Sequence, residues 1–139
     1  MKVETIIHWI VCHFEGVNVA KAFGGTFFSC DEQGMYPFAT IVTADDEYDS
    51  FSNLNRDAEC YRLNIGLEKG EFKQMFDLGG EYDYTAVDML MPHPVYGKNG
   101  WISVVNPSEE TFVKLQPMIE AGYRRAIEKE AERQVRREN

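Results

Sequence analysis

The sequence has few of the residue patterns that bind metals, phosphates or lipids. It contains three cysteines in 139 residues and no C-x-x-C pair, so we expect neither zinc binding nor dithiol redox chemistry. It has no G-x-G-x-x-G after a strand-like segment and no G-K-[ST], the signatures of the common phosphate-binding loops. Its first residues contain no basic leader before a long apolar segment, and no run approaches about 18 apolar residues. We expect a soluble, cytoplasmic protein without cofactor, metal or membrane contact.

Basic residues are also scarce. The chain has 14 Lys and Arg against 23 Asp and Glu, which gives a net charge of −9. Residues 124–139 hold six basic and four acidic side chains, which leaves eight basic and 19 acidic in residues 1–123. A field of this sign repels phosphate backbones, so we do not expect a nucleic-acid partner unless the terminal basic cluster acts locally.

The length and the apolar content fit one packed domain. With 139 residues and 44% hydrophobic residues, the chain can bury a core without disulfides or metals, and we interpret the cysteines as buried free thiols. We expect a domain over residues 1–127. Residues 128–139 are expected to form a charged helical extension, because glutamates alternate there with basic side chains.

Hydrophobic spacing predicts an α+β fold. Apolar residues at three- and four-residue intervals predict a helix near the N-terminus and a longer one that starts at Ser108 and is kinked or restarted at Pro117. Alternating segments predict five strands, at residues 17–23, 26–30, 36–43, 60–67 and 100–107. Short helical segments are predicted at 68–76 and near 83–91. Consecutive strands favour an antiparallel sheet, with the N-terminal and C-terminal helices on one face of a two-layer sandwich.

Two segments contain candidate functional residues. In "CYRLNIGL" the apolar residues face one side of the strand, and Arg62 and Asn64 face the other. In "MPHPVYGKNGW" two prolines restrict His93, with Tyr96, Lys98 and Trp101 nearby. The candidate binding residues are therefore His93, Tyr96, Lys98, Trp101, Arg62 and Asn64. We assign no catalytic residue, since no nucleophile or carboxylate stands at a fixed spacing from His93. A structural His93 that hydrogen-bonds the backbone is the competing interpretation, as is a purely packing role for Trp101.

The stretch at residues 44–59, "ADDEYDSFSNLNRDAE", has no helical or strand period and is predicted to be a solvated acidic loop. It does not fit an EF-hand, because Ser50 and Arg56 stand where that motif requires Gly and Glu.

Two resemblances are carried by these residues. "TFFSCDEQGMYPFATIVTADDEYD" together with "MPHPVYGKNGW" resembles an uncharacterised bacterial family of this length, a domain of unknown function. "YRLNIGLEKGEF" followed by "MPHPVYGKNGWISVVNPSEETFVKLQPMIEAGYRRAI" is more distantly similar to the MmcQ/YjbR proteins, chiefly at Lys98, Trp101 and the strand and helix around them. The second resemblance implies a secretion-chaperone-like or frataxin-like fold. It also implies DNA binding, which the net charge of −9 disfavours.

Three functions follow as hypotheses. The first is a non-catalytic binding module whose open sheet face contacts a protein or small molecule, with a homodimer as a further option. The second is nucleic-acid binding through the basic terminal helix. The third is a small-molecule enzyme that uses His93 as a general acid–base, with Asp45 or Glu47 folded over the site.

Overall fold

The computed structural model describes residues 1–77 and 79–138. The elements follow in the order α1 (Val3–His13), β1 (Asn18–Ala22), β2 (Gly25–Ser29), β3 (Pro37–Val42), β4 (Arg62–Gly66), α2 (Lys69–Met75), β5 (Met91–Pro92), β6 (Trp101–Val105) and α3 (Glu109–Glu138), with 3-10 turns at Leu54–Arg56 and Gly97–Asn99. The predicted α+β class is confirmed.

The strands form one antiparallel sheet in the order β1-β2-β3-β4-β6-β5. The sheet has six strands rather than the five predicted, because Met91–Pro92 pairs with β6 at the edge. A two-residue strand is too short to show alternation in the sequence, and an edge is where a sheet tolerates proline.

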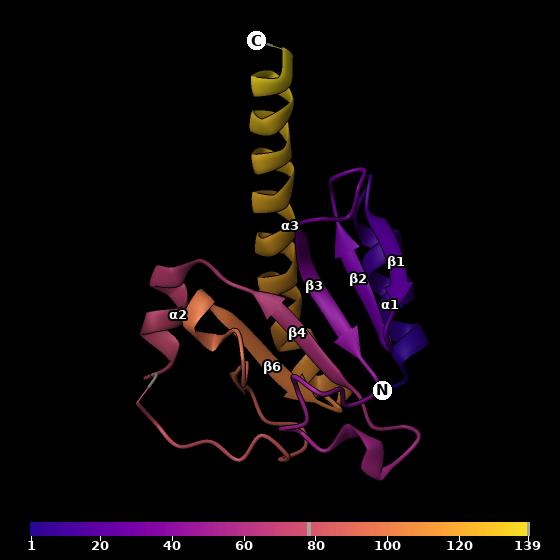
Figure 1. Cartoon of the computed structure of the whole chain (residues 1–139), viewed down its shortest axis with the longest axis vertical. Helices are drawn as coiled ribbons and strands as arrows, with labels where there is room; N and C mark the ends of the chain where they lie inside the picture. The colour runs from indigo at the N-terminus through magenta and orange to yellow at the C-terminus, as the bar shows by residue number, and fades with distance from the viewer. Residues whose placement is uncertain (78, 139) are drawn as a thin grey trace.

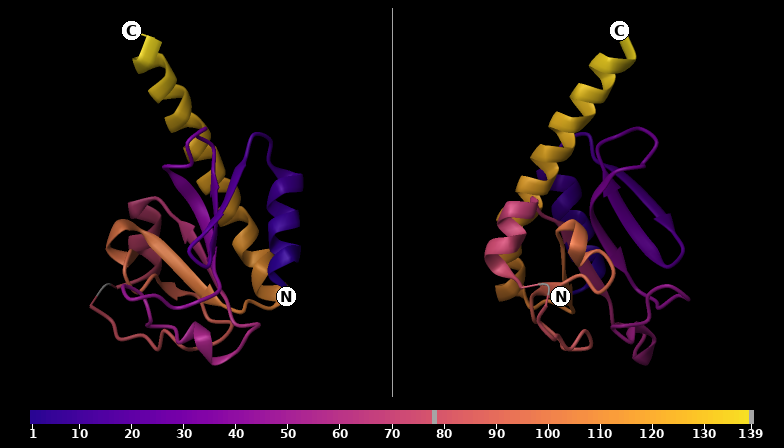
Figure 2. Two further views of the ribbon diagram at one scale, coloured as in Figure 1. Left: turned by 45° about the vertical axis from the view of Figure 1, so that its right-hand side comes forward. Right: turned by 60° about the vertical axis from the view of Figure 1, so that its left-hand side comes forward.

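Both terminal helices lie on the same face of the sheet, as predicted (Figures 1 and 2). Ile6 and Ile10 of α1 and Leu115 and Ile119 of α3 pack against the sheet. The sheet residues in this core are Phe28, Phe38, Ala39, Ile41, Tyr61, Leu63, Ile65, Ile102 and Val104. The main core is therefore on the helical side. The other face of the sheet carries polar and aromatic side chains and a smaller buried cluster of Leu54, Cys60 and Val105.

Helix α3 is one continuous helix that runs on into the predicted charged extension. It continues through Pro117 without a restart, because the apolar residues on both sides of the proline pack on the same sheet. Ser108 caps it as predicted, with its Oγ accepting the N–H of Thr111 at 3.1 Å. Its C-terminal turns extend past the sheet (Figure 1). Glu130, within the predicted extension 128–139, is buried, and residue 139 of that extension lies outside the described residues.

Two smaller predictions are wrong. The segment near 83–91 forms no helix, because the Asp83 carboxylate accepts hydrogen bonds from the Thr85 N–H and Oγ–H and closes only a turn. The cysteines are not uniformly buried, since Cys60 is buried and Cys12 is exposed on α1. The helices of the described ranges include none with the length and apolar character needed to span a bilayer.

The β1–β2 hairpin has an unusual turn. Its two central residues, Phe23 and Gly24, have φ of 53° and 72°. Two positive φ values are typical of a type I′ turn, in which Asn-Gly is the favoured pair. A bulky residue in this conformation is strained, and the Phe23 side chain is also 96% exposed. Neither backbone preference nor burial explains a phenylalanine at this position.

Candidate functional site

The sheet face opposite the helices is partly covered by the acidic loop, residues 44–59. Asp45 and Asp46 shape this loop through its own backbone: Asp45 Oδ1 accepts the Leu54 N–H at 2.9 Å, and Asp46 Oδ1 accepts the Tyr48 N–H at 2.7 Å. The loop is folded back over the sheet by Asp49, whose carboxylate is paired with Arg62 of β4. Most residues of the loop are exposed, as predicted for a solvated loop, but a buried arginine on the sheet attracts one of its carboxylates.

Arg62 is the centre of a buried polar network. The whole residue is 1% exposed, and every nitrogen of its guanidinium has a partner. Nε donates to Asn64 Oδ1 at 2.9 Å, and Nη1 donates to Ser52 Oγ at 2.9 Å and to Asp49 Oδ1 at 3.2 Å. Nη2 donates to Asp49 Oδ2 and lies 3.3 Å from His93 Nε2. Arg62 thus holds the loop and the His93 segment together, with four of its five N–H groups donated to Asn64, Ser52 and Asp49.

Asn64 extends this network across the sheet. Its Oδ1 also accepts the Ser103 Oγ–H at 2.7 Å, and its Nδ2 donates to Thr40 Oγ1 at 3.0 Å. β3, β4 and β6 are therefore linked by side chains on this face as well as by their backbones. The alternation of "CYRLNIGL" predicted the face, but the network identifies Arg62 and Asn64 as supporting residues beneath the site.

The carboxylate of Asp49 is charged within the network. Burial raises the pKa of Asp49, but the hydrogen bonds and the positive charge of Arg62 together outweigh burial and hold the pKa below its usual value. The Arg62–Asp49 pair is therefore ionised and internally neutral at ordinary pH.

His93 is held neutral by its surroundings. Its Nδ1 accepts the backbone N–H groups of Val95 and Tyr96, both at 3.0 Å, which assigns the proton of the neutral ring to Nε2. Burial lowers its pKa, the charge of Arg62 lowers it further and the charge of Asp49 opposes them, which leaves the pKa at about 3. At neutral pH the ring is uncharged and its one acceptor nitrogen is occupied. These backbone bonds are those expected of a structural histidine rather than of a general base.

A cavity of about 760 Å³ lies over this network, between the sheet, the acidic loop and the His93 segment. Its wall is rich in aromatic and apolar side chains, with carboxylates on the loop side. The residues that line it are Phe23, Phe27, Pro37, Thr40, Val42, Asp46, Glu47, Tyr48, Asp49, Arg62, Asn64, His93, Val95, Tyr96 and Trp101. All of the candidate residues predicted from the sequence, apart from Lys98, thus meet at one cavity.

Lys98 and Trp101 lie in different surroundings from the other candidate residues. Lys98 lies on the other side of the His93 segment, beside a smaller pocket of about 260 Å³ with Tyr82 and Tyr84. Trp101 is half-buried at the rim of the sheet, opposite Gly66 in the strand register, where its ring fills the space that a Cβ would occupy. Trp101 also lines a second pocket beside α3.

Sequence reasoning missed the residues that build the cavity from the loops. Tyr48 and Phe23 were not among the candidates, and Asp49 was passed over in favour of Asp45 and Glu47. One signal was present: a strand arginine facing a covered surface needs a carboxylate, and "DDEYDS" is the nearest acidic segment. Within the described ranges, no group of three His, Cys, Asp or Glu side chains is placed to hold a metal ion.

Comparisons with known proteins give one match. A family model described as "Family of unknown function (DUF6194)" matches residues 1–135. No curated protein and no solved structure matches significantly.

Proposed function

We propose that this chain, which belongs to the family of unknown function DUF6194, is a non-catalytic binding protein whose ligand is a small apolar or aromatic molecule with a positive charge. The single observation that carries the proposal is the aromatic cavity of about 760 Å³ with carboxylates on its rim. The ligand would lie over the Arg62–Asn64 network, between the acidic loop and the His93 segment.

The apolar part of the proposed ligand follows from the cavity wall. A volume of about 760 Å³ falls in the range of small-molecule sites, roughly 300–1,000 Å³. Exposed rings stand at the rim, since Tyr48 is 79% and Tyr96 is 54% exposed. Covering such rings removes apolar surface from water at about 25 cal/mol per Å².

The positive charge of the proposed ligand follows from the carboxylates. Arg62 is neutralised by Asp49, so it does not favour an anion. Glu47 lines the cavity and is exposed, and within the described part of the chain it has no ion-pair or hydrogen-bond partner through its carboxylate. A cation there would meet this carboxylate and the faces of tyrosine or tryptophan rings, a combination that suits organic ammonium groups.

The backbone conformation and the exposure of Phe23 are a separate observation that supports a binding role. It stands in a strained turn position, almost fully exposed, at the edge of the cavity. Exposed aromatic residues that the fold itself does not need are typical of ligand contacts. Asparagine at this position would fit the turn better but would offer the ligand no ring.

The His93 geometry supports a non-catalytic role over the enzyme hypothesis. The ring is neutral, Nδ1 is bonded to two backbone N–H groups, and the Asp49 carboxylate is directed at Arg62. Asp45 is bonded to the backbone of its own loop. No described carboxylate is hydrogen-bonded to the His93 ring, which favours the non-catalytic role over an acid–base pair.

Calorimetric titration with two probes tests the proposal. Benzyltrimethylammonium and benzenesulfonate share an aromatic ring and differ in the sign of their charge. We expect the cation to bind and the anion to bind at least about tenfold more weakly, because the cavity rim is acidic. Equal affinities, or tighter binding of the anion, would contradict the proposal.

Matched variants locate the binding. Glu47→Gln and Phe23→Asn should each weaken binding of benzyltrimethylammonium about three- to tenfold, since each removes one rim contact. Glu59→Gln removes the same charge from an exposed residue of the acidic loop that does not line the cavity, so it should leave binding unchanged. If Glu59→Gln weakens binding as much as Glu47→Gln, the effect is one of net charge and not of this site.

Other parts of the sequence-based interpretation remain predictions. These are the distant MmcQ/YjbR relationship, a cytoplasmic location, the domain boundary after residue 127 and a homodimer, which light scattering tests. Nucleic-acid binding through the terminal helix predicts salt-dependent retention on DNA that is lost on deletion of residues 124–139.

A further inference from the structure

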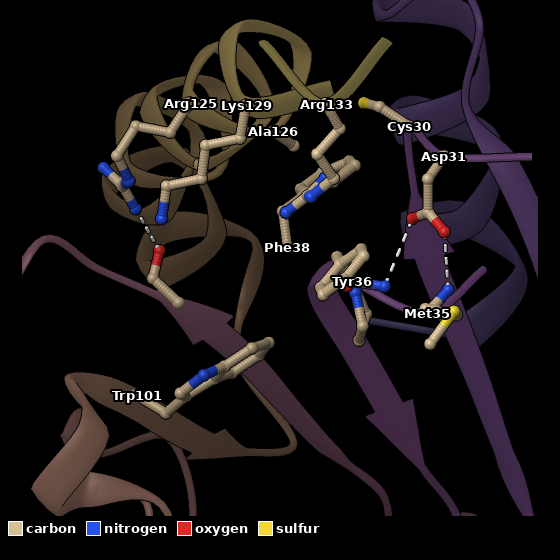
Figure 3. Close-up of a pocket in the computed structure, with 13 residues that line it drawn as sticks. Cys30, Asp31, Met35, Tyr36, Phe38, Trp101, Arg125, Ala126, Lys129 and Arg133 are labelled. Carbon is tan, nitrogen blue, oxygen red and sulfur yellow. Dashed lines mark hydrogen bonds between the residues drawn. The ribbon is translucent and has the colours of Figure 1, made fainter. Parts of the chain in front are cut away.

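A second pocket, of about 350 Å³, adjoins the aromatic cavity, since Pro37 and Trp101 line both. It is bounded by α3, by the turn between β2 and β3, and by the ends of β4 and β6 (Figure 3). Its charge is opposite to that of the cavity. Arg125, Lys129 and Arg133 of α3 line it, and Asp31 is the only acidic residue among its described lining residues.

The three cations share one face of α3. They are four residues apart, so each lies about 6 Å along the helix axis from the next. Like charges at this spacing repel one another, and each such pair destabilises the helix by a few tenths of a kcal/mol. The charge of Arg133 is compensated by an ion pair with Glu130, in which Nη1 and Oε2 are 3.2 Å apart. Arg125 and Lys129 have no carboxylate within ion-pair distance in the described ranges.

The remaining polar groups of the pocket do not neutralise these charges. The Asp31 carboxylate faces the backbone of its own turn, where it accepts the N–H groups of Met35 at 2.7 Å and Tyr36 at 3.1 Å. Arg125 donates to the backbone carbonyl of Gly66 at 2.6 Å, which fixes its guanidinium at the pocket wall and leaves other N–H groups free. The Cys30 thiol is uncharged, because burial, Asp31 and Glu130 raise its pKa to about 11.

Aromatic rings complete the pocket. Figure 3 shows Trp101 and Tyr36 on the sheet side and Arg125 and Lys129 on the helix side. The Tyr36 ring is covered by the Arg133 guanidinium, whose Cζ is 3.6 Å from the ring centre. The Trp101 ring has no such cover from a cation in the described chain, so its exposed surface is available to a flat group.

We propose that this pocket binds a small organic phosphate, with the phosphate between Arg125 and Lys129 and a planar group against Trp101. A phosphate monoester carries close to two negative charges at neutral pH and several acceptor oxygens, which matches two unpaired cations on adjacent turns of one helix. Binding would also relieve the repulsion between these cations. The site shares Trp101 and Pro37 with the proposed cation-binding cavity, but its three cations line only this pocket.

Calorimetry with four probes tests the proposal. The probes are adenosine monophosphate, adenosine, inorganic pyrophosphate and a short single-stranded DNA oligonucleotide, all with the full chain. We expect adenosine monophosphate to bind more tightly than adenosine, which lacks the phosphate, and than pyrophosphate, which lacks the ring. Tight, salt-dependent binding of the oligonucleotide without competition from adenosine monophosphate would overturn the proposal in favour of a nucleic-acid surface. No binding of adenosine monophosphate or pyrophosphate at millimolar concentration would also overturn it.

The variant Lys129→Gln should weaken binding of adenosine monophosphate about tenfold, because it removes one charge-assisted contact. Arg124→Gln is the matched control: its side chain is 72% exposed, is paired with Glu120 on the same helix and does not line the pocket. Both substitutions remove one positive charge from an exposed position of α3, so a loss of folding is not expected of either. Equal losses of affinity in the two variants would show a general field effect and contradict the site.

Discussion

The neutral state of His93 predicts a pH dependence of stability. In the unfolded chain an ordinary histidine takes up a proton near pH 6.5, whereas folded His93 stays neutral down to a pKa of about 3. Between these values the unfolded state binds more protons, so the free energy of unfolding falls as the pH falls. The slope is about 1.4 kcal/mol per pH unit for one such group. The stabilisation is therefore complete above about pH 6.5, and about 2 kcal/mol of it is lost by about pH 5.

The ionisable groups that face His93 do not titrate in the pH range of this experiment, about pH 5 to 7.5. Arg62 stays charged, and Asp49, whose pKa lies below its ordinary value, stays ionised above about pH 5. The Tyr96 ring packs beside His93, with the two ring centres 5.0 Å apart.

Urea unfolding followed by circular dichroism, at several pH values from about 5 to 7.5, measures the effect. The reference is His93→Asn, in which the asparagine Oδ1 can accept the N–H groups of Val95 and Tyr96 without titrating. The wild-type protein should lose about 2 kcal/mol more than this variant between about pH 7.5 and 5. Parallel curves for the two proteins would refute the assignment of a buried, neutral His93.

Further substitutions test other parts of the structure by the same unfolding assay. Asp49→Asn should cost about 3 kcal/mol, because it leaves the buried Arg62 without its carboxylate, whereas Glu47→Gln should cost less than about 0.5 kcal/mol; equal costs would contradict the network. Gly100→Ala should destabilise the protein by about 2 kcal/mol, since φ of Gly100 is +91° and the new Cβ would lie 2.9 Å from the Leu67 carbonyl oxygen. Gly70→Ala in α2 has open space around the new Cβ, so it should stabilise the protein by about 0.5–1 kcal/mol. Phe23→Asn should raise stability by about 1 kcal/mol while it weakens binding of benzyltrimethylammonium, and a stability loss would refute the strain at this turn.

The layer arrangement could be predicted from the sequence because it depends on local periodicity. Ile6 and Ile10 mark the inner face of α1, and Leu63 and Ile65 mark the inner face of β4; both pairs lie in the core. The same alternation placed Arg62 and Asn64 on the outer face. Strand β5 could not be predicted, because its two residues are too few to show an alternation of apolar and polar side chains.

The cavity depends on contacts between segments far apart in the sequence, and periodicity carries no information about these. Asp49 pairs with Arg62 across 13 positions, and the Arg62 guanidinium meets His93 across 31. The candidates near His93 were found because two prolines and an aromatic residue surround it, but Lys98, equally close in sequence, faces a different pocket. Phe23 could not be recognised before its positive φ was known, because the sequence placed it at the end of the predicted strand 17–23 and not in the turn.

The most direct test of a binding function is to locate a bound probe by intermolecular nuclear Overhauser effects. With benzyltrimethylammonium bound, the N-methyl protons should show contacts to the rings of Tyr48 and Tyr96, and the benzyl ring should contact Phe27, which lines the aromatic cavity and not the α3 pocket. Contacts confined to the helical face, to the α3 pocket or to no residue of the cavity would contradict the account.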